Sequence, residues 1–153
     1  MNTLDQKDRR ILDLLQQDAT IPVADIAERV GLSRTPCWRR IRELEKQGFI
    51  RKRVALLDRT RLGAGITVFM AVRTNQHNAK WLERFRGAVH ALPEIVEANR
   101  LSGDSDYLLR ILVPDIKGFD KVYKRLIEMV EFSDVSSSFS MEELKSTTAI
   151  PVL

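Results

Sequence analysis

The sequence predicts an α/β protein of two domains: an N-terminal winged helix-turn-helix domain over residues 1–65 and a C-terminal ferredoxin-like βαββαβ domain over residues 66–153. Three observations predict this. Residues 23–48 have the spacing of two short helices joined by a tight turn. After Gly65 the pattern changes to strands that alternate with helices. The net positive charge is confined to the first part. Residues 1–65 hold 14 Lys and Arg against 9 Asp and Glu, and residues 66–153 hold 11 against 12.

The first helix is predicted to begin at Asp5, whose carboxylate can cap it, with Asp8 close to its positive end. Its apolar side recurs at helical spacing, and residues 16–20 end it. The residues of this side are Leu4, Ile11, Leu12 and Leu15. A three-helix core of this size is marginal by itself, so we expect a further element to cover part of it.

The second helix has one apolar side, formed by Val23, Ile26, Ala27 and Val30. Gly31 follows directly, and glycine favours the left-handed conformation in which many helices end. We predict Thr35 as the cap of the third helix. The reason is that Pro36 fits a first helical turn and pushes the residue before it out of the helical region.

The third helix places Cys37, Ile41 and Leu44 on its apolar side, and its opposite side is cationic. A short helix, a glycine turn and an arginine-faced helix are typical of a helix-turn-helix, whose second helix enters the major groove. The alternative is a solvated basic side on an ordinary helical hairpin. We favour DNA binding, and the candidate contact residues are Ser33, Arg34, Thr35, Trp38, Arg39, Arg40, Arg42 and Lys46.

Residues 49–58 are prone to form a strand and carry the basic triplet Arg51–Arg53. They are interpreted as a wing or linker strand that touches the phosphate backbone. A surface strand whose charges prevent edge aggregation is nearly as good an interpretation. The glycines in residues 59–65 mark the domain boundary.

The second domain is predicted to contain strands at 66–74, 95–101, 107–113 and 135–144, with helices at 79–92 and 116–130. On the last strand, Val135, Ser137, Phe139 and Met141 are expected to share one face. Two helices cover only one face of the sheet, yet Phe69, Leu108 and Leu112 make the other face apolar as well. We therefore expect the second face to pack against another copy in a two-fold dimer, which would hold two helix-turn-helix units at a spacing that fits a pseudo-palindrome.

Composition argues against several other classes of protein. The single cysteine, Cys37, cannot form an intrachain disulfide, and its place on an apolar helix side favours a buried thiol. Cys37, His77 and His90 do not have metal-ligand spacing, and neither histidine has a nucleophile or carboxylate partner at useful spacing, so we expect no metal, no cofactor and no enzyme. No apolar run is long enough to span a bilayer and the first residues lack the apolar core of a signal peptide, so we expect a cytoplasmic protein.

The sequence resembles the Lrp/AsnC (feast/famine) family of transcription regulators over nearly its whole length. The resemblance lies in LDQKDRRILDLLQQDA, IAERVGLSRTPCWRRIRELEKQGFI, SGDSDYLLRILVPD and SDVSSSFSMEELKSTT. It implies a sequence-specific regulator of amino-acid metabolism, whose sheets pair into dimers that assemble into tetramers or octamers. It also implies that a small effector, usually an amino acid, binds at subunit interfaces near the loop after the second strand of the second domain.

By that match the candidate effector residues are Gly103, Asp104, Ser105, Asp106 and Tyr107, with Ser137 adding a hydroxyl. The chemistry is compatible, because an acidic turn offers carboxylates to an ammonium group and backbone N–H groups to a carboxylate. Without the resemblance, an ordinary hairpin turn would be favoured for the loop, and exposed serines on an edge strand would explain Ser137. A regulator whose second domain only dimerises and binds no ligand is a further alternative.

Overall fold

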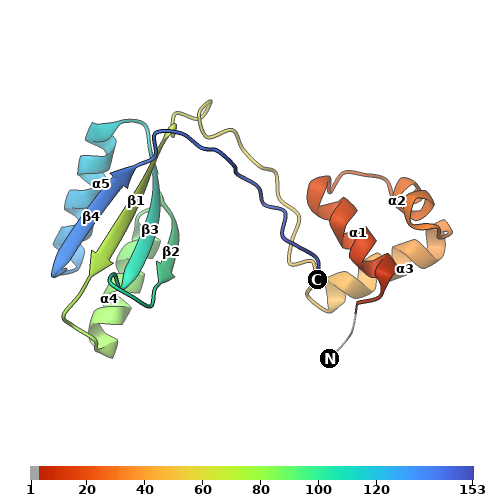
Figure 1. The fold of residues 1–153 in the computed structure, drawn as a ribbon, viewed down its shortest axis with the longest axis horizontal. Helices are drawn as coiled ribbons and strands as arrows, with labels where there is room; N and C mark the ends of the chain where they lie inside the picture. Colours follow the sequence, from red (N-terminus) through yellow and green to blue (C-terminus); the bar gives the residue numbers. More distant parts are fainter. Residues whose placement is uncertain (1–3) are drawn as a thin grey trace. The chain divides into compact units, whose positions relative to one another are not determined.

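The computed structural model describes residues 4–153 (Figure 1). The chain divides into two compact units. One, here called the head, holds the chain up to Leu56 together with Leu144–Leu153, and the other, here called the platform, is Leu57–Glu143. The division differs from the expected 1–65 and 66–153, because Leu144–Leu153, here called the return segment, packs with the head. The side chain of Gln16 donates to the Ile150 carbonyl and accepts from its N–H, both at 2.9 Å.

The head contains three helices, α1 (Gln6–Gln17), α2 (Val23–Val30) and α3 (Arg34–Lys46). The predicted cap of α1 is confirmed: Asp5 accepts from the Asp8 N–H at 2.8 Å, and the Asp8 side chain accepts from the Asp5 N–H in return. The apolar sides of the three helices meet in one small core. Its buried residues are Ile11, Leu15, Ile26, Ala27, Val30, Cys37, Ile41 and Leu44.

The turn between α2 and α3 confirms one expectation and corrects another. Gly31 ends α2 in the left-handed conformation, with φ 66°. The predicted cap Thr35 is wrong, because α3 begins at Arg34 and its cap residue is Ser33. The extended backbone of Ser33 lets its carbonyl accept from the Cys37 N–H at 3.2 Å, so Thr35 already lies within the first turn. Pro36 occupies that first turn, as expected.

The expected wing strand is also wrong. Residues 51–58 have no regular secondary structure, and α3 ends in a turn at Gly48, where φ is 81°. The N–H groups of Phe49 and Ile50 both bond back to the Leu44 carbonyl. A strand is stable only when it is paired, and within residues 4–153 the segment has no partner strand.

The platform contains β1 (Ile66–Arg73), α4 (Ala79–Ala91), β2 (Ile95–Arg100), β3 (Tyr107–Val113), α5 (Ile116–Met129) and β4 (Asp134–Phe139). All neighbouring strands are antiparallel, in the order β2-β3-β1-β4. The predicted element order is therefore confirmed. β4 ends at Phe139, which pairs with Val68, rather than at 144. The Ser140 N–H still donates to the Thr67 carbonyl at 2.9 Å, and after this bond the chain leaves the sheet although β1 extends to Ile66. Met141 consequently lies beyond the strand and is 95% exposed.

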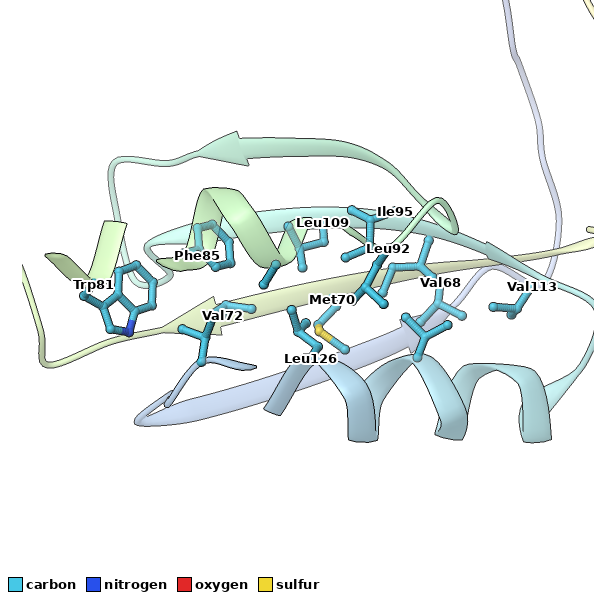
Figure 2. Close-up of a cluster of buried hydrophobic side chains, with 14 residues drawn as sticks. Val68, Met70, Val72, Trp81, Phe85, Leu92, Ile95, Leu109, Val113 and Leu126 are labelled. Atoms are coloured by element: carbon cyan, nitrogen blue, oxygen red, sulfur yellow. The ribbon is translucent and has the colours of Figure 1, made fainter. Parts of the chain in front are cut away.

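The platform core lies between the sheet and the two helices (Figure 2). Met70, Leu109 and Leu126 are fully buried in it. Two aromatic residues of α4, Trp81 and Phe85, stack with ring centroids 5.0 Å apart. The Trp81 indole N–H donates to the Glu131 carbonyl at 2.8 Å, so the one polar atom of this ring is satisfied.

The opposite face of the sheet carries no helix of the platform. Phe69 of β1 pairs in register with Arg110 of β3 and Ser138 of β4, and its side chain is 40% exposed. Leu108 and Leu112 are half-buried on the same face. The structure thus shows the second apolar face that the sequence predicts, while its pairing with another copy stays a prediction.

Candidate nucleic-acid interface and ligand loop

The outer side of α3 is the candidate nucleic-acid interface. Its apolar side is buried in the head core through Cys37, Ile41 and Leu44. All but one of the residues predicted to contact DNA are exposed on or beside α3. These exposed residues are Ser33, Arg34, Thr35, Trp38, Arg39, Arg42 and Lys46.

Arg40 is the exception, and the structure gives it a different partner. Its Nη1 lies 2.6 Å from Asp5 Oδ2 and 2.8 Å from Asp8 Oδ1, and its side chain is 34% exposed. The Asp8 and Asp5 carboxylates raise the pKa of Arg40, while the Asp8 N–H and then the Arg40 guanidinium lower the pKa of Asp5. Arg40 therefore holds α3 to the beginning of α1 within the head, and its contact with DNA stays a prediction.

Arg42 is positioned by two neighbours. Its guanidinium carbon lies 5.9 Å from the centroid of the Trp38 ring, a cation–π distance, and its Nη1 lies 3.1 Å from Glu45 Oε2. The other carboxylate oxygen of Glu45 lies 2.9 Å from Arg53. The sequence pattern does not identify this role of Glu45, because Arg53 lies eight residues away, outside α3. The structure shows that it orients two cations next to the exposed side of α3.

Arg34 and Arg39 keep their donors available. Among residues 4–153 no carboxylate forms an ion pair with either of them. A guanidinium can donate two parallel hydrogen bonds to a guanine edge or to a phosphate. The exposed side of α3 is thus a cationic surface whose arginines can reach an external acceptor.

The candidate ligand loop joins β2 to β3. Gly103 has φ 136°, a conformation that favours glycine, and Asp104 is exposed. Asp106 has a structural part, because its Oδ2 accepts from the Thr74 N–H at 2.8 Å and its own N–H donates to the Val72 carbonyl at 2.9 Å. These bonds fix the end of the loop against the end of β1, and they leave Gly103, Asp104 and Ser105 as its free part.

The remaining two predicted ligand residues lie on the helix-covered side of the sheet. The Tyr107 ring packs against Phe85, with centroids 4.6 Å apart. Ser137 pairs in register with Met70 and is half-buried. Since β1 lies between β3 and β4, a single copy of the chain does not bring Ser137 next to the loop.

Neither the cysteine nor the histidines form a reactive centre. Cys37 is fully buried, and burial raises the pKa of its thiol. His77 and His90 are exposed residues of the platform. Within the described part of the chain, no three His, Cys, Asp or Glu side chains are grouped so that they could hold a metal ion. No helix in residues 4–153 has the length and apolar character needed to cross a bilayer.

A three-helix head with an arginine-faced third helix, joined to an antiparallel α/β platform, defines the class of DNA-binding transcription regulators that carry a separate ligand domain. Comparison with protein families also gives two domains, although the second match extends into the return segment. Residues 4–51 match the model of a winged helix-turn-helix DNA-binding domain, and residues 67–150 match the Lrp/AsnC ligand binding domain. The chain belongs to the Lrp/AsnC family of transcription regulators, as the resemblance predicted.

Several relatives match the chain over nearly its full length. It is 50% identical to a glutamate uptake regulatory protein of Zymomonas mobilis, over 97% of this chain and 91% of that one. It is 45% identical to the DNA-binding transcriptional activator DecR of Escherichia coli, over 97% and 99%.

Two crystal structures share its fold. One is an AsnC family transcriptional regulator of Agrobacterium tumefaciens, with TM-score 0.94, 53% identity and 97% of both chains covered. The other is a Neisseria meningitidis transcriptional regulator in complex with L-Met, with TM-score 0.92, 34% identity and coverage of 98% of this chain and 97% of that one.

Proposed function

We propose that two copies of this regulator pair through the open faces of their sheets and present two α3 helices to a pseudo-palindromic DNA site. The single observation that most supports DNA binding through α3 is a contrast within that helix: Arg40 is held by Asp5 and Asp8, whereas Arg34 and Arg39 are free to donate. A single small helix-turn-helix makes few base contacts, so two units at fixed spacing give the needed specificity. Assembly of dimers into tetramers or octamers is part of the proposal.

The proposed DNA contacts are made by the exposed side of α3 and its beginning. Arg34, Arg39 and Arg42 bind bases or phosphates, and Lys46 binds phosphate. The hydroxyl groups of Ser33 and Thr35 can donate hydrogen bonds to phosphates of the DNA backbone. The Trp38 ring supports the Arg42 guanidinium. Because the bacterial chromosome lies in the cytoplasm, we propose that the protein acts there.

The proposed effector is an amino acid bound at a subunit interface beside the loop between β2 and β3. The exposed carboxylate of Asp104 suits an ammonium group, and backbone N–H groups around Gly103 suit a carboxylate. Names of similar proteins support this chemistry, since one is called a glutamate uptake regulator and another is bound to L-Met. Ser105 and Tyr107 border the loop, Asp106 fixes its shape, and Ser137 takes part only if another copy supplies it.

The effector acts through linkage. It changes DNA binding only if it prefers one assembly, or one spacing of the two heads, over another. The proposal contains no chemical step, so the amino acid is recovered unchanged after incubation with the protein. Conversion of the bound amino acid to another compound would contradict it.

The test starts from duplexes that the full chain selects from a random DNA pool. The selected sites are expected to be pseudo-palindromic, and binding to them weakens steeply as salt rises. Arg39→Ala and Arg42→Ala each lower affinity for the selected duplex by roughly ten- to a hundredfold, whereas Arg10→Ala, which removes an exposed arginine of α1, changes it little. Unchanged affinity in both α3 variants would show that the wrong surface has been assigned.

A second experiment tests the effector loop. Calorimetry with each of the twenty amino acids is expected to give heat with at least one, and Asp104→Asn is expected to weaken that binding. Heat from none of them would favour a regulator whose second domain only dimerises.

A further inference from the structure

A groove on the platform is lined by Tyr107, which borders the β2–β3 loop, but not by the free part of that loop, residues 103–105. It is bounded by α4 and by the helix-facing side of β2, and its volume is about 510 Å³. β2 is an edge strand. α4 buries Ile95 at the start of this strand but leaves Ala98 and Arg100 exposed, although both face the same side of the sheet. The groove exists because α4 covers only the beginning of β2.

The floor of the groove is apolar. Phe85 and Ile95 reach it from the platform core, where Figure 2 shows them near Leu92 and Leu109. Leu82 and Val89 of α4 are half-buried along its wall. A branched or aromatic side chain of a small molecule could therefore bury its apolar surface there.

The rim of the groove is cationic. Arg86 and His90 of α4 and Arg100 of β2 line it, and all three are exposed. Across the described chain none of them forms an ion pair, whereas Arg73, Arg110 and Arg125 of the same unit each pair with a carboxylate. Cations that share a rim without a counter-charge favour an anionic ligand.

The groove has no available carboxylate. Glu97 is the one acidic residue that lines it, and its Oε2 lies 3.1 Å from Arg110 Nε. Arg110 and Glu97 are also partners in register, and they face the side of the sheet away from the helices. An ammonium group in the groove would thus lie beside arginines and find no acceptor of opposite charge.

We propose that this groove binds a small apolar carboxylate that lacks an ammonium group, such as a branched-chain 2-oxo acid. Arg86 and Arg100 bind the carboxylate, and the apolar floor binds the side chain. The loop around Asp104 has the opposite preference, because its exposed carboxylate suits an amino acid. The platform would then distinguish an amino acid from its deaminated counterpart at two sites, the free part of the loop and the groove, with Tyr107 between them, which goes beyond the effector site proposed above.

The test compares two ligands with the same carbon skeleton, 4-methyl-2-oxopentanoate and L-leucine, by calorimetry on the full chain without DNA. The oxo acid is expected to bind and leucine is expected not to compete with it. Both titrations are repeated with Asp104→Asn, which removes the proposed amino-acid site but leaves the groove intact. A failure of the groove proposal can therefore be distinguished from a failure of the proposed amino-acid site at the loop.

Four variants locate the binding. Arg86→Gln and Arg100→Gln are each expected to weaken oxo-acid binding by about tenfold or more. Arg84→Gln is the matched control, since it removes a positive charge from the same helix but lines a different hollow, near Glu128. Ala98→Leu fills the groove without a change of charge and is expected to abolish binding.

Three results would overturn the proposal. The first is no heat with millimolar oxo acid, and the second is an oxo-acid affinity in Arg86→Gln and Arg100→Gln equal to that of the unmodified protein. The third is displacement of the oxo acid by leucine that binds as tightly as the oxo acid does. Thermal unfolding of each variant checks that it is folded. If Ala98→Leu proves unfolded, the two arginine variants still decide, because both side chains are exposed.

Discussion

The head and the platform are stabilised in different ways. The platform core contains stacked aromatic rings and a sheet buried on one side by two helices. The described head core has aliphatic residues and one cysteine, and it is supplemented by polar contacts at its edges: Arg40 with Asp5 and Asp8, and Gln16 with Ile150. Loss of a buried apolar side chain should therefore damage the platform most, and loss of the Arg40 or Gln16 contacts should act on the head.

The largest effect is expected from a cavity in the platform. Leu126→Ala removes a fully buried side chain and should lower the free energy of unfolding by about 2–5 kcal/mol. Urea unfolding followed by Trp81 fluorescence in a Trp38→Phe background measures this, since Trp81 lies in the platform core. Ile116→Ala on the same helix is the control, because Ile116 is 67% exposed and its loss should cost about 0.5 kcal/mol or less.

A smaller effect is expected when the contact between α1 and α3 is removed. Arg40→Met keeps much of the side-chain volume and should destabilise the head by about 1 kcal/mol or less, because the pair is partly exposed to solvent. Amide exchange at Ile11 and Ile41 measures the head alone. DNA affinity at a temperature where the head is folded should change little, in contrast to Arg39→Ala. A loss of affinity as large as that of Arg39→Ala would return Arg40 to the DNA-contacting surface.

Acid should weaken the head through the cap of α1. The pKa of Asp5 is lowered in the folded state, first by the Asp8 N–H and also by the Arg40 guanidinium. Its contribution to stability is thus present above its ordinary pKa of 3.8 and is lost as pH falls through the lower folded pKa. Amide exchange in α1 between pH 5 and pH 3 should show this decline, and Asp5→Asn, which can still cap, should show a shallower one. An equal decline of α1 protection with falling pH in both proteins would show that Asp5 is not the cause.

The smallest effect is expected at the return segment. Gln16→Ala removes two hydrogen bonds to exposed backbone and should cost the head no more than about 1 kcal/mol. The exchange rate of the Ile150 amide should rise clearly, because its acceptor is lost. Gln17→Ala, on the same helix and exposed, should leave that rate unchanged.

The sequence predicted what depends on local pattern. Helical and strand periodicity placed every helix and strand of both units, and the Asp5 cap follows from residues three apart. The wing strand was wrong because a strand needs a partner that local pattern does not identify. The end of β4 at Phe139 was missed as well, because the local pattern of residues 140–144 does not show where pairing with β1 stops.

The sequence predicted which surface of the head forms the candidate site, but not the contacts of each residue on it. Spacing placed Arg39 and Arg42 outside the core, but it also grouped Arg40 with them. The partners of Arg40 lie 32 and 35 residues away, and the contact of Gln16 with Ile150 spans 134 residues. Contacts of such separation have no periodic signal in a single sequence. The groove beside β2 was missed for a related reason, because it depends on how far α4 extends over an edge strand.

The return segment has a consequence for biosynthesis. A ribosome makes the three helices of the head first, but it makes residues 144–153 only after the entire platform has been translated. On a nascent chain α3 therefore emerges early, while the contact between Gln16 and Ile150 is completed late. The head therefore acquires its full set of contacts only after the whole platform has been synthesised.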